Sequence, residues 1–154
     1  MRLLKNKYFL SAVIFFAFIL DRLFKWLVLN REGFFAVKNI LKINYYPNQG
    51  LALSFPVASY LLYPLIILII IIVFYFLIIS LKRSNYFFLW SFGLIFVGAV
   101  SNLIDRVRFG HVVDYVNFLG WFPVFNISDA MIVLGVGLIF IKSFGRNNLT
   151  DILK

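Results

Sequence analysis

The chain has 154 residues, of which 63% are hydrophobic, 14% are charged and none is cysteine. Soluble domains are about half apolar and about a quarter charged, so this composition is typical of a protein that lies in lipid. Without cysteine there is no disulfide, thiolate nucleophile or iron–sulfur site, and the single histidine, His111, cannot form a multi-histidine metal site. A nucleophile must then be a serine, threonine, lysine or carboxylate-activated water.

The formal net charge is +9. No basic run interleaved with aromatic residues marks a nucleic-acid-binding face, so nucleic acid is not expected as a partner. We expect the basic residues to flank membrane segments and to contact anionic lipid headgroups. The length predicts a single integral-membrane domain, 1–154.

Four long apolar segments predict four transmembrane helices, because a helix needs about 20 apolar residues to cross a bilayer. Their approximate limits are 8–29, 58–81, 86–104 and 125–143. The first segment follows basic residues, as a signal peptide does. However, Leu20-Asp21-Arg22 stands where a small-residue cleavage site would be, so we expect a retained helix.

The Lys and Arg residues divide almost evenly between the two ends of these helices, but one group is nearly free of acidic neighbours. The positive-inside rule then favours cytoplasmic termini and places 30–57 and 105–126 outside. The first outer segment contains the β-prone run 42–46, followed by Pro47-Asn48-Gln49-Gly50, which predicts a turn.

Most acidic residues lie at or beside the outer ends of the apolar segments, where ionisable groups are costly and indicate function by default. Asp21 and Lys25 are four residues apart, which favours a structural helical ion pair. Asn102, Asp105 and Arg106 share one face at the end of the third helix. Arg106 could hold a carboxylate through two bonds, and a network that fixes the helix end is favoured.

Asp114 and Asp129 lie on either side of the segment that precedes the fourth helix. Nothing basic is close to Asp129 in sequence. If the intervening segment folds back, the two carboxyls can share a proton, so that one activates water as a base and the other polarises a carbonyl as an acid. Asp129 could equally cap the helix, and the spacing leaves both interpretations open.

Five short segments are spaced along the chain, each at the end of a predicted helix. They are Asp21-Arg22-Leu23-Phe24-Lys25, Asn48-Gln49-Gly50-Leu51-Ala52-Leu53-Ser54-Phe55, Gly98-Ala99-Val100-Ser101-Asn102-Leu103-Ile104-Asp105-Arg106, Val112-Val113-Asp114 and Phe125-Asn126-Ile127-Ser128-Asp129. Together they resemble the lipoprotein signal peptidases, also called signal peptidase II. The resemblance covers most of the chain.

The resemblance implies an all-α bundle of four transmembrane helices with a small extracytoplasmic β-cradle and a short amphipathic helix. It implies a membrane aspartic endopeptidase of the bacterial plasma membrane, with Asp114 and Asp129 as the catalytic pair and no metal or cofactor. The supporting or substrate-binding residues would be Asn48, Gly50, Asn102, Asp105, Arg106 and Asn126. The substrate would be a diacylglyceryl-modified prolipoprotein, cleaved just before the modified cysteine, and no obligate protein partner is implied.

The chain departs from the usual family pattern at five positions, none of which removes a reacting group. Val97 and Ser101 replace glycine, Leu53 replaces phenylalanine, Ser128 replaces alanine, and Ala130 replaces a small polar residue. Side chains at 97 and 101 must fit a closely packed helix. We expect these departures to bear on substrate preference and inhibitor sensitivity.

Two other classes of protein remain as alternatives. A small transporter could use Asp21, Asp105 and Asp129 as a proton path, but acids at the midplane would suit that function better than acids at one membrane edge. A structural subunit predicts scattered acids, whereas these are clustered.

Overall fold

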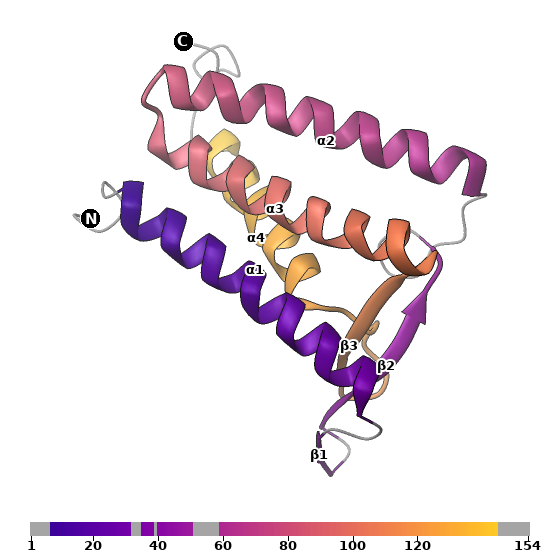
Figure 1. Ribbon diagram of the computed structural model, residues 1–154. Helices are drawn as coiled ribbons and strands as arrows, with labels where there is room; N and C mark the ends of the chain where they lie inside the picture. Colours follow the sequence, from indigo (N-terminus) through magenta and orange to yellow (C-terminus); the bar gives the residue numbers. More distant parts are fainter. Residues whose placement is uncertain (1–6, 32–34, 39, 51–58, 145–154) are drawn as a thin grey trace.

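The computed structural model describes residues 7–31, 35–38, 40–50 and 59–144. Four long helices and a small sheet make up this part of the chain (Figure 1). The helices are α1 (Lys7–Asn30), α2 (Ser59–Lys82), α3 (Tyr86–Phe109) and α4 (Ile127–Phe144), and the strands are β1 (Phe35–Val37), β2 (Leu41–Asn48) and β3 (Val112–Phe118). The predicted mainly helical fold with a small β-structure is therefore confirmed.

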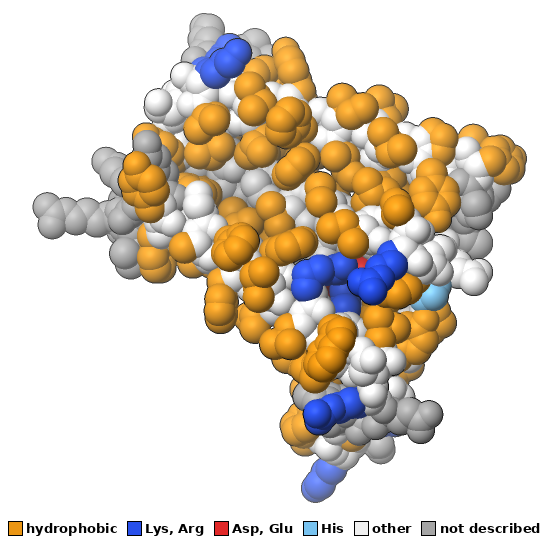
Figure 2. Space-filling model, viewed as in Figure 1, with side chains coloured by type: hydrophobic (Ala, Val, Ile, Leu, Met, Phe, Trp, Pro, Cys, Tyr) orange, Lys and Arg blue, Asp and Glu red, His pale blue; other side chains and the backbone are white. Residues whose placement is uncertain are grey.

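Within the described part of the chain, three helices are long and apolar enough to cross a membrane, namely Tyr60–Lys82 within α2, α3 and α4. Hydrophobic side chains cover most of the helical surface on the face shown in Figure 2. The first helix, α1, carries Asp21, Arg22 and Lys25 in its second half and is not among the three. The count of four spans thus stays a prediction.

Helix α3 occupies the centre of the bundle, and α1, α2 and α4 all pack against it (Figure 1). Two glycines permit the close contact between α3 and α4. A Cβ added to Gly98 would lie 2.6 Å from the Ser128 carbonyl oxygen, and one added to Gly135 would lie 2.6 Å from the Ser91 carbonyl oxygen. Small residues at such positions let helix backbones approach one another in lipid, where packing rather than water exclusion drives association.

The sheet is antiparallel, with strand order β1-β2-β3. Its central strand β2 has an irregular register between Ile43 and Tyr46. The predicted turn at Pro47-Asn48-Gln49-Gly50 is wrong in its first half, because Pro47 and Asn48 are still strand residues and pair with Val113 and Val112 of β3. The chain turns after Asn48, whose Oδ1 accepts the Gly50 N–H at 3.0 Å.

A buried apolar cluster fixes the sheet against the helices. Val28 of α1 packs with Val113 and Tyr115 of β3, and Phe24 and Ile127 pack around them. The Phe24 and Tyr115 rings stack with centroids 5.6 Å apart. Strand β3 is consequently buried over its first four residues and lies between the ends of α1 and α4.

Two helix limits differ from the predicted ones. Helix α3 continues to Phe109 instead of ending near 104, because Asp105 and Arg106 are buried and have partners inside the protein. Gly110, with a left-handed φ of 79°, ends it by donating its N–H to the Arg106 carbonyl. Helix α4 begins at Ile127 instead of 125, since Phe125 pairs with Val116 as an extended bridge.

Other expectations fall on parts of the chain that the structure does not describe. The expected short amphipathic helix is not among the elements of the described residues. The second family segment is described only as far as Gly50, so Leu53 lies outside the described residues.

Candidate active site

Asp114 lies on β3 and is 1% exposed. Its two carboxylate oxygens each accept a side-chain amide hydrogen. Asn48 Nδ2, at the end of the neighbouring strand β2, donates to Oδ2 at 2.8 Å, and Asn126 Nδ2, directly before α4, donates to Oδ1 at 2.7 Å. Sheet pairing and the start of α4 therefore fix this carboxyl from two sides.

Asp129 lies in the first turn of α4. Asn126 accepts the Asp129 N–H at 2.8 Å through its Oδ1, and Asp129 Oδ2 accepts the Asn126 N–H at 3.2 Å. This reciprocal pair has the arrangement of a helix capping box. Asp129 thus takes part in the cap as the third residue of α4, and Asn126 is the N-cap residue.

The other oxygen of Asp129 faces α3. Asn102 Nδ2 donates to Asp129 Oδ1 at 2.7 Å. Asn126 donates to Asp114 and to Asn102 Oδ1, the latter at 3.3 Å, so this one side chain links both carboxyls and α3. The structure thus brings Asp114 and Asp129 to one place, as the sequence predicts, with three asparagines between and around them.

All four carboxylate oxygens of this pair accept a hydrogen bond from an amide N–H. Amides neither give up nor take up a proton near neutral pH, so they orient the carboxyls without competing in proton transfer. Each carboxylate oxygen has two lone pairs, so one N–H leaves capacity for a further donor such as water.

The pKa of Asp114 is raised to about 7, because burial disfavours the charged form and because the negative charge of Asp129 repels a second one. The bonds from Asn48 and Asn126 act in the opposite direction and favour the carboxylate. Asp114 therefore binds a proton close to neutral pH, as the spacing argument expects for carboxyls that share one.

A second group of charged residues lies beside the pair. It consists of the buried Asp21, Lys25 and Asp105 and the partly exposed Arg22. The predicted Asp21–Lys25 ion pair is present at 3.0 Å, and Lys25 also binds Asp105 at 2.7 Å. Arg22 contacts Asp105 at 2.8 Å and Asp21 at 3.2 Å. The expectation that Asp105 belongs to a network at the end of α3 is confirmed. Its ion-pair partners are on α1, and it also accepts the Val113 N–H of β3 at 3.3 Å.

Arg106 has a different partner from the one expected. Its guanidinium donates to the Gly50 carbonyl oxygen at 2.6 Å, and no two-pronged carboxylate bond occurs among the described residues. Its backbone carbonyl accepts the Tyr63 hydroxyl of α2 at 3.3 Å. Arg106 therefore ties the end of β2 to α3, beside Asn48.

Three residues that support this region were not singled out as site residues from sequence. Ser101 and Ser128 each donate a hydroxyl to Asp21 Oδ2 at 2.7 Å. Tyr115 donates to Asp21 Oδ1 at 3.1 Å and accepts the Ile127 N–H at the same distance. Ser101 and Ser128 are two of the positions at which the chain departs from the family pattern. This departure is the sequence feature that could have indicated their role.

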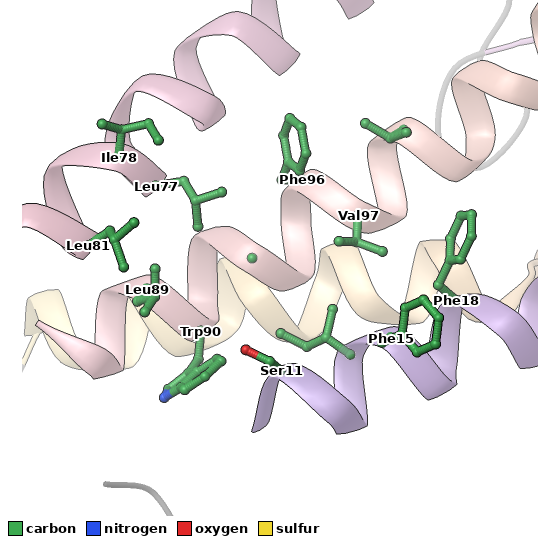
Figure 3. A pocket seen from close by; sticks show the side chains of 13 residues that line it. Ser11, Phe15, Phe18, Leu77, Ile78, Leu81, Leu89, Trp90, Phe96 and Val97 are labelled. Carbon is green, nitrogen blue, oxygen red and sulfur yellow. The ribbon is translucent and has the colours of Figure 1, made fainter. Parts of the chain in front are cut away.

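A separate apolar cavity of about 530 Å³ lies between α1, α2 and α3 (Figure 3). Its lining contains no titratable side chain, so it is not the place of the acid–base chemistry. Val97, the departure from glycine in α3, lines it together with Phe15, Phe18 and Phe96.

Comparison with known proteins gives the family. The model of a family described as signal peptidase (SPase) II matches residues 13–145. The chain belongs to the signal peptidase II family. It is therefore a membrane peptidase, and the aspartic type fits the carboxyl pair of Asp114 and Asp129. The transporter and structural-subunit interpretations are thereby set aside.

Individual members of the family agree over nearly the full length. A lipoprotein signal peptidase of Halothermothrix orenii is 33% identical, over 90% of this chain and 97% of that protein. One from Staphylococcus epidermidis is 35% identical, over 90% of this chain and 92% of that protein. A bacterial membrane enzyme of known structure superimposes with a TM-score of 0.77 at 29% identity, covering 91% of this chain and 90% of the other.

Proposed function

We propose that this signal peptidase II removes the signal peptide from diacylglyceryl-modified prolipoproteins by cleaving just before the modified cysteine. Water activated between Asp114 and Asp129 would be the nucleophile. The observation that carries the mechanism is the pair formed by the buried carboxyl of Asp114 and the half-buried carboxyl of Asp129, in which every oxygen accepts one amide N–H. The substrate class is supported by the relatives named lipoprotein signal peptidase.

The surroundings assign different tasks to the two acids. Asp129 lies in the first turn of α4, where the helix dipole favours a negative charge, so we take it as the ionised base. Asp114, with its pKa raised to about 7 by burial and by Asp129, is the acid that holds the proton. The pair then contains one proton and one negative charge, which is the state needed for concerted acid–base catalysis.

The reaction balances with this single proton. Asp129 removes a proton from water while the water oxygen bonds to the scissile carbonyl carbon, and Asp114 gives its proton to the carbonyl oxygen. The resulting tetrahedral diol breaks its C–N bond as Asp129 transfers its proton to the leaving nitrogen. A diol hydroxyl returns a proton to Asp114, so the starting state of the enzyme is restored.

The neighbouring polar residues position the pair in this scheme. Asn48, Asn102 and Asn126 hold the carboxyls through the bonds described above. Arg106 holds the Gly50 carbonyl and thereby fixes the segment that follows Asn48. Asp105 and the Asp21–Lys25 ion pair support the site from α1 and α3.

We further propose that α1 is the fourth transmembrane span, that both termini are cytoplasmic, and that the carboxyl pair lies near the outer face of the plasma membrane. The site occupies the end of the bundle that carries the sheet (Figure 1). A cytoplasm-specific reporter fused after Ser84 or after Lys154 should be active in both cases, and activity at one fusion alone would contradict this topology.

The direct test uses purified wild type, Asp114→Asn, Asp129→Asn and the double variant on a diacylglyceryl-modified precursor, with cleavage followed by gel shift. Each single variant should lose on the order of a thousandfold or more in rate, because acid–base catalysis and electrostatic stabilisation vanish together. The double variant should be no worse than either single one, since members of one catalytic unit are not additive.

Asp151→Asn is the matched control, because it makes the same chemical change in the C-terminal segment outside the described residues. It should cleave at the wild-type rate. Membrane insertion of each variant is measured in parallel, so that lost activity is separated from lost protein. A well-inserted Asp129→Asn enzyme that processes the precursor at the wild-type rate would refute the mechanism.

A further inference from the structure

Lys25 is a lysine buried deep in the bundle, with a relative exposure of 2%. Its ammonium group has three hydrogens and three partners. These are Asp21 Oδ2 at 3.0 Å, Asp105 Oδ2 at 2.7 Å and Asn102 Oδ1 at 3.0 Å. Two of the partners are acids of the buried ion-pair group, and the third is the amide that contacts Asp129.

Two cations, Lys25 and Arg22, balance the charges of the two acids, so charge balance alone does not show which cation acts on the carboxyl pair. Arg22 already contacts both acids, at 3.2 Å to Asp21 and 2.8 Å to Asp105. Asp21 also accepts hydroxyl hydrogens from Ser101 and Ser128. The contact that distinguishes Lys25 from Arg22 is the one with Asn102, because the polar contacts of Arg22 in the described part of the chain are with the two acids.

The contact with Lys25 determines how the Asn102 amide is turned. An ammonium group can only donate, so it must face the amide oxygen and not the amide nitrogen. Asn126 Nδ2, also a donor, approaches the same oxygen at 3.3 Å. The nitrogen of Asn102 is therefore turned to the opposite side, where it donates to Asp129 Oδ1 at 2.7 Å. A reversed amide would place its oxygen against the carboxylate, where the two would repel each other.

We propose that Lys25 is a positioning residue for the peptidase reaction, which orients the Asn102 amide toward Asp129 and supplies positive charge beside the carboxyl pair. The proposal rests on the proposed function of Asp114 and Asp129 and goes beyond an ion pair that stabilises α1. Lys25 acts through Asn102 and does not touch the reacting atoms.

The charge of Lys25 also affects proton binding by the pair. Its positive charge favours the ionised form of Asp114 and so opposes the rise in the pKa of that carboxyl. The charged or titratable groups that face this region are Asp21 and Arg22 of α1, Asp105 and Arg106 of α3, Asp114 and Tyr115 of β3, and Asp129 of α4. Loss of the Lys25 charge therefore raises the pH at which the pair loses its shared proton.

The test compares Lys25→Met with Arg22→Gln, each of which removes one cation from the same group of ion pairs. Lys25→Met should lower kcat about tenfold or more, the size expected for loss of a hydrogen bond to a charged centre. It should leave KM nearly unchanged and move the whole pH–rate profile upward by about 0.5 pH unit or more. Arg22→Gln should lower the unfolding temperature and leave the pH–rate profile in place.

A charge-balanced variant, which loses one positive and one negative charge together, separates the role of Lys25 from misfolding caused by an unpaired buried acid. Lys25→Met combined with Asp105→Asn leaves Asp21 and Arg22 as a neutral pair, and an asparagine at 105 can still accept the Val113 N–H that Asp105 Oδ2 accepts at 3.3 Å. This variant should keep the lowered kcat, because Asn102 still lacks its ammonium partner, whereas loss of the Asp105 charge should offset part of the shift in the profile. Lys25→Arg retains the charge and the donors, so it should recover part of the rate and most of the profile.

The outcomes separate this proposal from the proposed function. If the wild type cleaves the precursor and Asp129→Asn does not, the peptidase mechanism stands. A folded Lys25→Met enzyme with wild-type kcat and pH profile would then overturn the role of Lys25. Full recovery of both in the charge-balanced variant would also overturn it, since Lys25 would then serve to neutralise Asp105.

Discussion

Gly98→Ala adds a methyl group to α3 and tests whether the geometry of the carboxyl pair depends on the position of α4. Gly98 of α3 faces the first turns of α4, and an added Cβ would lie 2.6 Å from the Ser128 carbonyl oxygen and 2.9 Å from Ile132 Cγ1. Ordinary contact begins at 3.4 Å, so the backbone at Ser128 must move by about 0.8 Å. Ser128 directly precedes Asp129, and the carboxylate that we propose as the base would move with it.

Two opposing free-energy terms apply to Gly98→Ala. Alanine favours a helix by about 1 kcal/mol relative to glycine. Overpacking of a close helix contact costs about 1–3 kcal/mol, and the atom that is too close is backbone, which cannot rotate away. We therefore expect net destabilisation of up to about 2 kcal/mol. The larger effect is on turnover, because a displacement of about 1 Å at a catalytic group can cost about a hundredfold in rate.

Gly137→Ala is the matched control for this experiment. Gly137 lies on α4, and an added Cβ would meet no atom within 4 Å. It should therefore have wild-type turnover and an equal or slightly higher unfolding temperature. The assays are precursor cleavage and thermal unfolding of the purified proteins in one detergent. If Gly98→Ala cleaves at the wild-type rate, the carboxyl pair tolerates a shift of α4 and the reasoning from close packing is refuted.

Three further outcomes follow from the site. Burial and the charge of Asp129 raise the pKa of Asp114 to about 7, so Asp114 is protonated below that pH and ionised above it. We therefore expect kcat/KM to fall as pH rises through about 7. A pH–rate profile that is flat up to pH 9 would contradict this. Tyr115→Phe should lower the free energy of unfolding by about 1–3 kcal/mol, since the Ile127 N–H loses its acceptor and Asp21 loses a donor. Denaturant titration measures this free energy. An unchanged midpoint of the unfolding transition would show that water replaces the hydroxyl. Arg106→Ala should lower kcat by about tenfold with the protein still inserted in the membrane, because the Gly50 carbonyl loses its charged donor. Full activity of this variant would show that Arg106 does not support the site.

The sequence predicts the helices well because lipid imposes a simple requirement on them. Four apolar segments of sufficient length correspond to four helices. The predicted limits differ from the observed ones only at the helix ends. The end of α3 was placed too early because Asp105 and Arg106 are polar residues that are nevertheless buried in the helix. Hydropathy cannot distinguish a polar residue with an internal partner from one that ends a span.

The site was predicted in its members more accurately than in its contacts. Asp114 and Asp129 could be paired by reasoning that an acid without a local cation needs a partner, and the geometry agrees. The partner of Arg106 could not be predicted, because it is a backbone carbonyl, at Gly50, which any residue type would supply. The donation by Ser101 and Ser128 to one oxygen of Asp21 depends on the crossing of α1, α3 and α4, and no spacing within a single segment encodes it.

The amide side chains around the carboxyl pair affect how the site responds to a change of pH. The side chains that contact the two acids are asparagines, which keep the same charge and the same donors across the range in which carboxylates and histidines titrate. A change of pH around neutrality therefore alters how far the carboxyl pair is protonated without changing these asparagine contacts. We expect activity to be lost when the pH is raised above about 7 and regained on return to neutral pH, reversibly over repeated cycles.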